Sequence, residues 1–492
     1  MKYYSTRSLL ETTAEGAIAM GLAPDGGLFV PEQIPRISLS DIDDLRKTDY
    51  RARAVQIMSM YLDSFSRVEL ERFAAAAYGT NFDHPSIAPV HALDGNTSFL
   101  ELWHGPTCAF KDMALQMLPH LLTASLKKTG EQRSVCILVA TSGDTGKAAL
   151  EGFADVVGTR IMVFYPHGGV SDVQRLQMAT QQGGNVGVCA VKGNFDDAQT
   201  GVKQIFGDAA LADSLSSRGW FLSSANSINW GRLLPQIVYY ISAYCDEVNA
   251  GRISLGDEIN FVVPTGNFGN ILAGWYAKQM GLPVRRFVCA SNENNILTDF
   301  ISTGIYDKNR PFHITASPSM DILVSSNLER LLFMLSGSAE ETACRMRSLR
   351  EEGRYQVSDA LLAKLQREFS CGFCDDDRTR AAIGGVWAEH QYLMDTHTAV
   401  AYQVLRDYRL QSGDRTHAVV VSTASPFKFC DHVLRAIGGK ADAPGVQLLD
   451  RLSDLTEIPV PPPLSGLAHR PVRFESVVGK NEMAETVRDF LA

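Results

Sequence analysis

The chain has 492 residues, 45% of them hydrophobic and 21% charged, and this balance excludes a disordered protein. Its length is too great for one ordinary hydrophobic core, so two or three domains are expected. The formal net charge of −9 argues against a general nucleic-acid binder, because neutralising backbone phosphates requires a basic surface. A local cationic pocket for a small anionic substrate is compatible with this charge.

The N-terminal sequence has no uninterrupted apolar core of the kind found in signal peptides, and no stretch approaches the roughly 20 apolar residues of a membrane helix. Nine scattered cysteines favour free thiols in a reducing compartment. We therefore expect a cytoplasmic protein with no membrane or nucleic-acid partner. Cys371 and Cys374 have the spacing of a redox or half-zinc motif, but no second pair follows and no strand is predicted before them. Chance explains this spacing better, and no metal is expected.

In chain order, a turn-rich stretch and a helix-like LERFAAAAYG come first and predict a small N-terminal unit over 1–90. From about residue 130, short apolar runs alternate with helix-like segments at 147–157 and 271–280. This alternation predicts an α/β fold with parallel sheets covered by helices, and ligands bound at the carboxyl ends of the strands. The predicted strands are VCILVA (135–140), IMVFY (161–165), VGVCAV (186–191), FVVP (261–264), FVCA (287–290) and AVVVSTA (418–424).

The proline run IPVPPPLSG cannot continue a helix or a central strand, and it is expected to lead to a short terminal strand and helix. The predicted organisation is an N-terminal unit over 1–90, a catalytic region over 91–465 and a C-terminal segment over 466–492. The catalytic region is expected to contain two α/β domains, of which the smaller covers about 130–240.

Two glycine-rich loops join a predicted strand to a predicted helix, ATSGDTG at 140–146 and PTGNFGN at 264–270. In each, glycine permits close backbone approach, and free N–H groups at the helix start favour an anion. The first loop is not a nucleotide phosphate loop, because Thr141 stands where the leading glycine belongs and Ala148 replaces the magnesium-binding hydroxyl. Taken alone, either loop is equally compatible with a simple tight turn.

Lys111 lies in HGPTCAFKDMALQ, between apolar residues and an apolar helix face. Burying a lysine costs free energy unless its amine is used. An amine forms a Schiff base with an aldehyde, and pyridoxal phosphate is an aldehyde that carries a phosphate. A lysine and an anion-binding loop in a multi-sheet α/β protein are therefore a coherent set. Without such companions, a lysine that reaches solvent from a helix start would be the better explanation of Lys111.

Six motifs follow one another along most of the chain, APDGGLFVP (23–31), HGPTCAFKD (104–112), ATSGDTG (140–146), SANSINWGR (224–232), PTGNFGN (264–270) and STASPFKF (422–429). Together and in this order they resemble threonine synthase, in its longer form with an N-terminal extension. The resemblance implies the tryptophan-synthase-β-like fold, in which two α/β domains hold pyridoxal 5′-phosphate between them.

The resemblance also implies roles for individual residues. Lys111 looks like the lysine that carries the cofactor, and Thr423 looks like the hydroxyl partner of its pyridine nitrogen. Ser142 and Asp144 resemble the loop that meets the substrate carboxylate and the 3-oxygen of the cofactor ring. The residues that resemble the cup for the cofactor phosphate are Gly266, Asn267, Phe268 and Asn270.

The implied reaction converts O-phospho-L-homoserine and water to L-threonine and phosphate, with Lys111 as the base, in a monomer or homodimer. The candidates to bind the departing phosphate are Lys147, Arg232 and Lys428, although for any one of them a solvated or structurally paired charge is the favoured explanation. His104 is expected to shape the Lys111 turn, and structural support is expected of His397.

Two other functions fit the same residues. The nearest is a pyridoxal-phosphate-dependent phospho-lyase that releases 2-oxobutyrate, ammonia and phosphate from O-phosphohomoserine. A catalytically silent binding or regulatory relative is the alternative from another class, and the presence of both the lysine and the phosphate loop argues against it.

Overall fold

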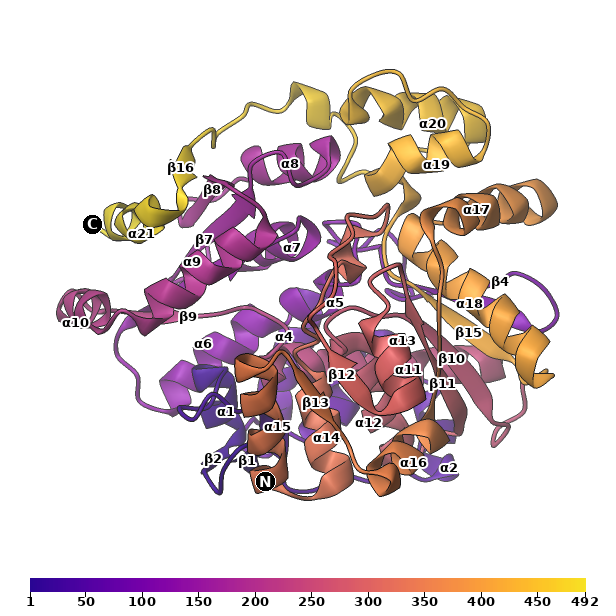
Figure 1. The fold of residues 1–492 in the computed structure, drawn as a ribbon, viewed down its shortest axis with the longest axis horizontal. Coiled ribbons are helices and arrows are strands. Elements are labelled where there is room, and N and C mark those ends of the chain that lie inside the picture. Colours follow the sequence, from indigo (N-terminus) through magenta and orange to yellow (C-terminus); the bar gives the residue numbers. More distant parts are fainter.

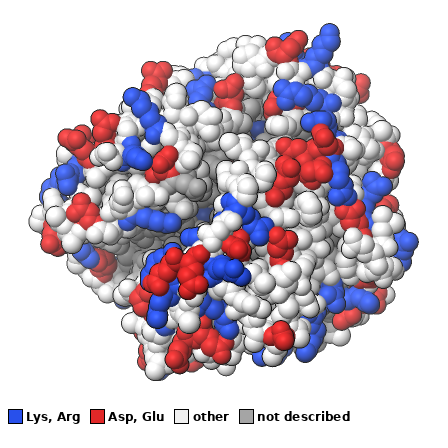
Figure 2. Space-filling model, viewed as in Figure 1, with Lys and Arg blue, Asp and Glu red and all other residues white. Residues whose placement is uncertain are grey.

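The computed structural model describes residues 1–492, the side chain of residue 196 excepted. Two larger sheets organise the chain, one of six strands and one of five, and helices cover both (Figure 1). A three-stranded and a two-stranded sheet accompany them. Figure 2 shows a hollow between the part of the molecule that carries the five-stranded sheet and the remainder, with charges of both signs spread over this face.

The six-stranded sheet has the order β14-β11-β10-β15-β5-β4, and its neighbouring strands are parallel except for the edge pair of β4 and β5. The carboxyl ends of five strands therefore lie along one edge, which is where α/β sheets bind ligands. The strands are β4 (Val90–Ala92), β5 (Thr97–Glu101), β10 (Ile259–Pro264), β11 (Val284–Ser291), β14 (Phe369–Phe373) and β15 (Ala418–Ser422).

Successive side chains of these strands point to opposite faces and enter different cores. Phe261 and Val263 of β10 pack in the core that contains α11 (Trp230–Asn249) and α12 (Gly269–Met280). Val262 packs in the core that contains α17 (Asp376–His390) and α18 (Thr396–Ser412). Burial on both faces explains why β10 reads as a continuous apolar run. The covering helices are α11 (Trp230–Asn249), α12 (Gly269–Met280), α13 (Ile296–Thr303), α16 (Asp359–Glu368), α17 (Asp376–His390) and α18 (Thr396–Ser412).

The five-stranded sheet has the order β16-β8-β7-β6-β9 and is parallel throughout. Its outer strand β16 comes from the C-terminal segment, which returns to this sheet from α20 (Figure 1). The strands are β6 (Ser134–Ala140), β7 (Thr159–Pro166), β8 (Val186–Lys192), β9 (Trp220–Ser223) and β16 (Val477–Gly479). The associated helices are α7 (Asp144–Phe153), α8 (Asp172–Ala179), α9 (Phe195–Gly207), α10 (Ala209–Ser217) and α21 (Met483–Phe490).

The N-terminal segment shares its core with the larger sheet, because Trp230 at the start of α11 packs against Tyr3, Tyr61 and Tyr276. Its elements are β1 (Lys2–Ser5), β2 (Glu11–Thr13), α1 (Ala14–Met20), β3 (Phe29–Pro31), α2 (Leu39–Leu45), α3 (Tyr50–Ser59) and α4 (Arg67–Ala77). The remaining elements are α5 (Asp112–Leu115), α6 (Leu118–Lys128), β12 (Ile305–Asp307), η1 (Pro318–Met320), α14 (Leu328–Ser336), α15 (Ala339–Glu351), β13 (Arg354–Gln356), η2 (Pro426–Phe429), α19 (Cys430–Ala436), η3 (Gly445–Gln447), α20 (Leu448–Thr456), η4 (Leu467–His469) and η5 (Lys480–Glu482).

The predicted α/β fold with parallel sheets is confirmed, and all six predicted strands are present. Most boundaries differ by one to three residues. The strand predicted over 418–424 ends at Ser422, and the helix predicted over 147–157 is α7, which covers Asp144–Phe153. The expected terminal strand and helix are β16 and α21. None of the helices within the described residues is long and apolar enough to cross a membrane.

The expectation that no strand leads into the cysteine pair is wrong, because Cys371 lies inside β14. The sequence FSCGF contains serine and glycine, which are poor strand formers, and pairing with β11 overrides that preference. Cys371 lies 3.4 Å from the hydroxyl of Ser302, whereas the thiol of Cys374 lies 3.4 Å from that of Thr379. Each cysteine thus has its own partner.

Candidate active site

The segment that carries Lys111 connects β5 to α5 and is attached to the end of β15. The backbone N–H of Phe110 donates to the carbonyl of Thr423 at 2.8 Å, and Ala109 forms an isolated β-bridge with Ala424. Because β5 and β15 are neighbours, both segments leave the same edge of the sheet. The structure therefore brings Lys111 beside Thr423, which lies 312 positions further along the chain.

The turn before Lys111 is held by buried polar contacts. The Asp112 carboxylate accepts hydrogen bonds from the backbone and the hydroxyl of Thr107 at 2.8 and 2.6 Å, and burial raises the pKa of Asp112 to about 6. His104 contacts Asp83 at 2.6 Å and Glu101 at 2.9 Å. Burial alone would lower the pKa of His104, but these carboxylates raise it to about 9. Asp112 and His104 thus fix the shape of the turn, as expected for His104.

The Lys111 amine is in an unfavourable place for a charge. Its Nζ atom lies 4.8 Å from the centre of the Phe110 ring and 3.4 Å from the hydroxyl of Ser319. Burial lowers the pKa of the Lys111 amine to about 8. The attraction of Asp144 opposes this change by raising the pKa, and the repulsion from Arg232 lowers it further. A lysine with such a pKa is partly neutral near physiological pH, as a nucleophile or a general base requires.

The first glycine loop follows β6 and is satisfied internally. The hydroxyl of Thr141 accepts hydrogen bonds from the backbone N–H groups of Gly143 and Gly146, both at 2.9 Å. Gly143 has φ 129°, and a Cβ atom there would lie 2.4 Å from the side chain of Gln174. Ser142 is half-buried in this loop. The loop is therefore closely packed, and two of its N–H groups are already bound.

Asp144 begins α7 and faces the Lys111 region. Its Oδ1 atom lies 2.8 Å from the ammonium of Lys428 and accepts a 2.8 Å hydrogen bond from Gln174, while its Oδ2 atom lies 3.4 Å from the Ser319 hydroxyl. Burial alone would raise the pKa of the Asp144 carboxyl, but Lys428 and Lys111 hold it well below its usual range. Asp144 is therefore an ionised carboxylate beside the lysine.

The second glycine loop follows β10 and leaves donors free. Phe268, with φ 61°, precedes α12 in the left-handed conformation without a side-chain cap for the helix. Asn270 is buried; its Oδ1 atom accepts from Tyr239 and Tyr240 at 2.6 and 2.7 Å, whereas its Nδ2 donor has no partner within the described residues. A Cβ atom on Gly266 would lie 2.6 Å from the carbonyl oxygen of Ser319. Asn267 is exposed.

The three predicted cations differ in their surroundings. Lys147 contacts Glu151 at 2.7 Å and also Gln181, and Lys428 pairs with Asp144. Arg232 is 3% exposed and donates to the carbonyl of Ala225 at 2.8 Å, but its Nε has no partner within the described residues. Burial lowers the pKa of this guanidinium to about 10. The structural interpretation thus suits Lys147 and Lys428, and Arg232 keeps an unused donor.

Sequence reasoning missed Ser319 and did not foresee how His397 acts. Ser319 belongs to the short turn η1, in a stretch of mostly small and polar residues with no glycine loop to draw attention. Its backbone N–H donates to Nε2 of His397 at 3.1 Å. His397 therefore supports Ser319 directly, which is more specific than the structural support expected of it.

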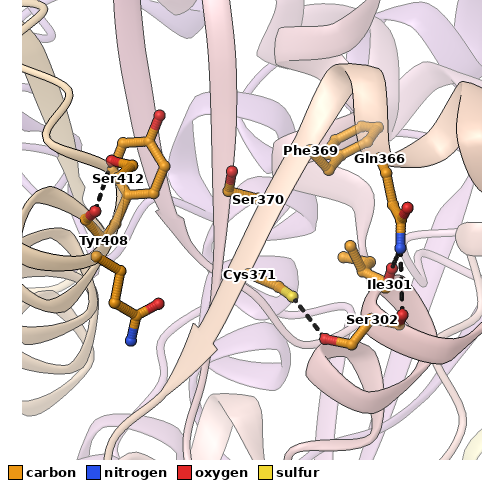
Figure 3. A pocket seen from close by; sticks show the side chains of 9 residues that line it. Ile301, Ser302, Gln366, Phe369, Ser370, Cys371, Tyr408 and Ser412 are labelled. Carbon is orange, nitrogen blue, oxygen red and sulfur yellow. Dashed lines mark hydrogen bonds between the residues drawn. The ribbon is translucent and has the colours of Figure 1, made fainter.

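A cavity of about 300 Å³ lies elsewhere, beside β14 (Figure 3). Cys371, Tyr408 and Ser412 are among its lining residues. In the sheet, β14 is separated by three strands from β5, after which the Lys111 segment begins. Among the described residues, no group of three or more His, Cys, Asp or Glu side chains could hold a metal ion. The carboxyl edge near Lys111 is thus the candidate site.

The donors at this edge suit an aldehyde with an anionic tail. A partly neutral lysine can condense with the aldehyde, and an uncapped helix start with an unpartnered amide donor at Asn270 can hold the anion. These are the features of the pyridoxal-phosphate-dependent enzymes, and a family model described as "Pyridoxal-phosphate dependent enzyme" matches residues 88–424. Models described as "Threonine synthase N terminus" and "Threonine synthase, C-terminal" match residues 2–78 and 398–491.

Individual relatives agree with these models. The threonine synthase of Pseudomonas aeruginosa is 40% identical over 92% of this chain and 93% of its own length. The human protein named threonine synthase-like 1 is 42% identical over 86% of this chain, which spans only 57% of the human protein. A crystal structure described as PLP-bound threonine synthase from Brucella melitensis has a TM-score of 0.88 and 37% identity, covering 100% of this chain and 99% of that one. The yeast threonine synthase structure has a TM-score of 0.88 and 32% identity, covering 99% and 98%.

The chain belongs to the threonine synthase family of pyridoxal-phosphate-dependent enzymes. Its cofactor is pyridoxal 5′-phosphate. The predicted tryptophan-synthase-β-like fold, with its parallel sheets and N-terminal unit, is confirmed by the likeness to these structures.

Proposed function

We propose that this enzyme converts O-phospho-L-homoserine and water to L-threonine and phosphate. The observation that carries the proposal is that the Lys111 amine, Asp144 of one glycine loop and Gly266 of the other all lie against Ser319. Similarity to threonine synthases along nearly the whole chain supports the choice of substrate.

In this proposal, Lys111 carries the cofactor and Thr423 faces its pyridine nitrogen. The cup for the cofactor phosphate comprises Gly266, Asn267, Phe268 and Asn270. When bound, the cofactor supplies an aldehyde for amines and a conjugated ring that spreads the charge left by proton removal. A hydroxyl such as that of Thr423 would not hold the ring nitrogen protonated, which restrains competing reactions.

Lys111 Nζ also removes and returns protons. The free Lys111 amine has a pKa of about 8, lowered by burial, and a base of this strength would suit proton transfer near neutral pH. Asp144 lies close enough to attract the ammonium form of Lys111 after the proton has been taken up. The pair thus holds the proton at Nζ until it is returned.

The substrate is oriented by charge. An ionised Asp144 repels a carboxylate, so we propose that Asp144 faces the substrate amine and that the hydroxyl of Ser142 faces the substrate carboxylate. Arg232 is the candidate cation without a carboxylate partner among the described residues, and it is proposed to bind the departing phosphate. A buried donor is strengthened by its low-dielectric surroundings, which favours loss of the phosphate.

Two experiments test this proposal. Purified protein is incubated with O-phosphohomoserine, and threonine is separated from 2-oxobutyrate; a majority yield of 2-oxobutyrate would establish the phospho-lyase instead. Borohydride trapping followed by mass spectrometry locates the cofactor. The adduct is expected on the peptide that contains Lys111, and an adduct on another peptide contradicts the assignment.

The rest of the proposal concerns organisation. We propose a division at about residues 90 and 465, with the smaller α/β domain over about 130–240, and a monomer or homodimer. A cytoplasmic location is supported by the nine cysteines, which are all free thiols in the fold.

A further inference from the structure

The turn η1 contacts several segments of the candidate site. Ser319 reaches Lys111 Nζ and Asp144 Oδ2 with its hydroxyl, both at 3.4 Å, and its carbonyl lies beside Gly266. Lys111 follows the larger sheet, Asp144 follows the smaller one, and Gly266 belongs to the second glycine loop. One serine therefore touches the three segments to which the proposed function assigns the chemistry.

The direction of these contacts follows from the charges. Asp144 is ionised and can only accept, so the Ser319 hydroxyl donates its single proton to Oδ2. An oxygen lone pair of Ser319 is then left for Lys111, whose amine must donate. Both distances are long, as is common for catalytic hydrogen bonds when no substrate is bound.

Ser319 is held from behind by a buried imidazole. His397, 2% exposed, accepts the backbone N–H of Ser319 at Nε2 (3.1 Å), which requires its proton on Nδ1. Nδ1 lies 2.9 Å from the carboxylate of Asp395, which is fully buried. Asp395 thus selects the tautomer of His397 that can accept from Ser319.

The following residues of this segment are fixed as well. The carboxylate of Asp321 accepts hydrogen bonds from Asn292, Asn294 and Thr315 at 2.7 to 3.0 Å. Because hydrogen bonds hold the turn at Ser319 and at Asp321, it loses little further conformational freedom when the Ser319 hydroxyl forms its hydrogen bonds.

We propose that Ser319 is a catalytic residue that orients the Lys111 amine by bridging it to Asp144 through its hydroxyl. We further propose that His397, oriented by Asp395, is the positioning residue that holds Ser319 in place. This inference rests on the proposed role of Lys111. According to this inference, the orientation and the proton affinity of the Lys111 amine are set by η1, a segment outside both the lysine motif and the glycine loops.

The test measures how acetylation of the Lys111 amine depends on pH, in the full-length chain freed of cofactor. Acetic anhydride acetylates neutral amines, and mass spectrometry of the peptide containing Lys111 gives the extent of modification at each pH. The charged groups that face this amine are Asp144, Arg232, Lys428 and Asp112. They are unchanged in all variants, so a shift reports on Ser319.

Ser319→Ala is expected to lower the midpoint of acetylation by about one pH unit, because it removes a hydrogen bond to the charged form of the amine. Ser319→Thr keeps a hydroxyl and is expected to restore most of the shift. The matched control is Ser302→Ala, which removes a serine hydroxyl in the cavity of Figure 3 and is expected to change nothing. A Ser319→Ala midpoint that equals that of the control, or lies above it, overturns the inference.

His397 provides a second pair of variants, which decides the matter if Ser319→Ala does not fold. His397→Gln keeps an acceptor for the Ser319 N–H and is expected to retain the midpoint, whereas His397→Phe removes it and is expected to lower the midpoint. Equal midpoints for the two overturn the inference. Failure of the proposed function is seen separately, as a borohydride adduct of the unaltered protein on a peptide other than that of Lys111.

Discussion

The two glycine loops look alike in sequence but are built for different tasks. Both follow a parallel strand and begin a helix, α7 in one case and α12 in the other. In the first loop, Thr141 already accepts two backbone N–H groups, and Gly143 is packed against Gln174. In the second, the buried amide of Asn270 keeps an unpartnered donor among the described residues. The second loop is therefore the better candidate to hold the cofactor phosphate.

This difference shows that a glycine-rich turn is evidence for an anion site only after its donors have been counted. An N–H that is bound internally is not available to a ligand, whereas a buried donor without a partner costs free energy until a ligand satisfies it. The first loop instead contributes the charge of Asp144, which acts on Lys111 at a distance.

The largest expected effect is that of Gly266→Ala in the second loop. The new Cβ atom would lie 2.6 Å from the Ser319 carbonyl, so either the loop or the η1 turn must move. We expect cofactor affinity to fall about 100-fold, corresponding to about 3 kcal/mol, as measured by spectroscopic titration. Gly95→Ala is the control, since its Cβ atom would meet nothing within 4 Å. Unchanged affinity for Gly266→Ala would remove this loop from the cofactor site.

Asn270→Asp is expected to have the next largest effect. The substitution keeps an oxygen for Tyr239 and Tyr240 but replaces the free donor by an acceptor with negative charge. We expect cofactor affinity to fall at least tenfold, or about 1.4 kcal/mol, in the same titration. If affinity is retained, the unpartnered amide does not face the cofactor phosphate.

Asp144→Asn tests the electrostatic part of the first loop. Burial lowers the pKa of the Lys111 amine to about 8, and the Asp144 charge opposes this change. Removing the charge therefore lowers the pKa further, and the acetylation midpoint of Lys111 is expected to fall by about one pH unit. A midpoint that rises would show that Asp144 does not stabilise the ammonium.

Thr141→Val is expected to have the smallest effect on cofactor affinity, less than about threefold. It leaves the N–H groups of Gly143 and Gly146 without their acceptor, so the free energy of unfolding should fall by about 2 to 4 kcal/mol. Denaturant unfolding and the cofactor titration measure the two quantities. A large loss of affinity with unchanged stability would reverse the assignments of the two loops.

Much of the fold could be predicted, because strands buried on both faces are continuous apolar runs. The runs at 261–264 and 418–424 correspond to β10 and β15 for this reason. β14 was missed because FSCGF is short and contains a glycine, and it becomes a strand by pairing with β11. In the site, Lys111 and the glycine loops carry local signals, whereas Ser319 and His397 carry none.

By itself, the sequence determined which chemical groups are present and which family the chain resembles, because Lys111, the glycine loops and the order of the motifs can be read directly from the sequence. Only the tertiary structure decided which donors are free, which cation lacks a carboxylate, and which serine meets the lysine. Those properties depend on contacts in space, and the contact of Lys111 with Ser319 joins residues 208 positions apart. Hydrogen bonds are satisfied in space, and no spacing along the chain records whether a partner is present.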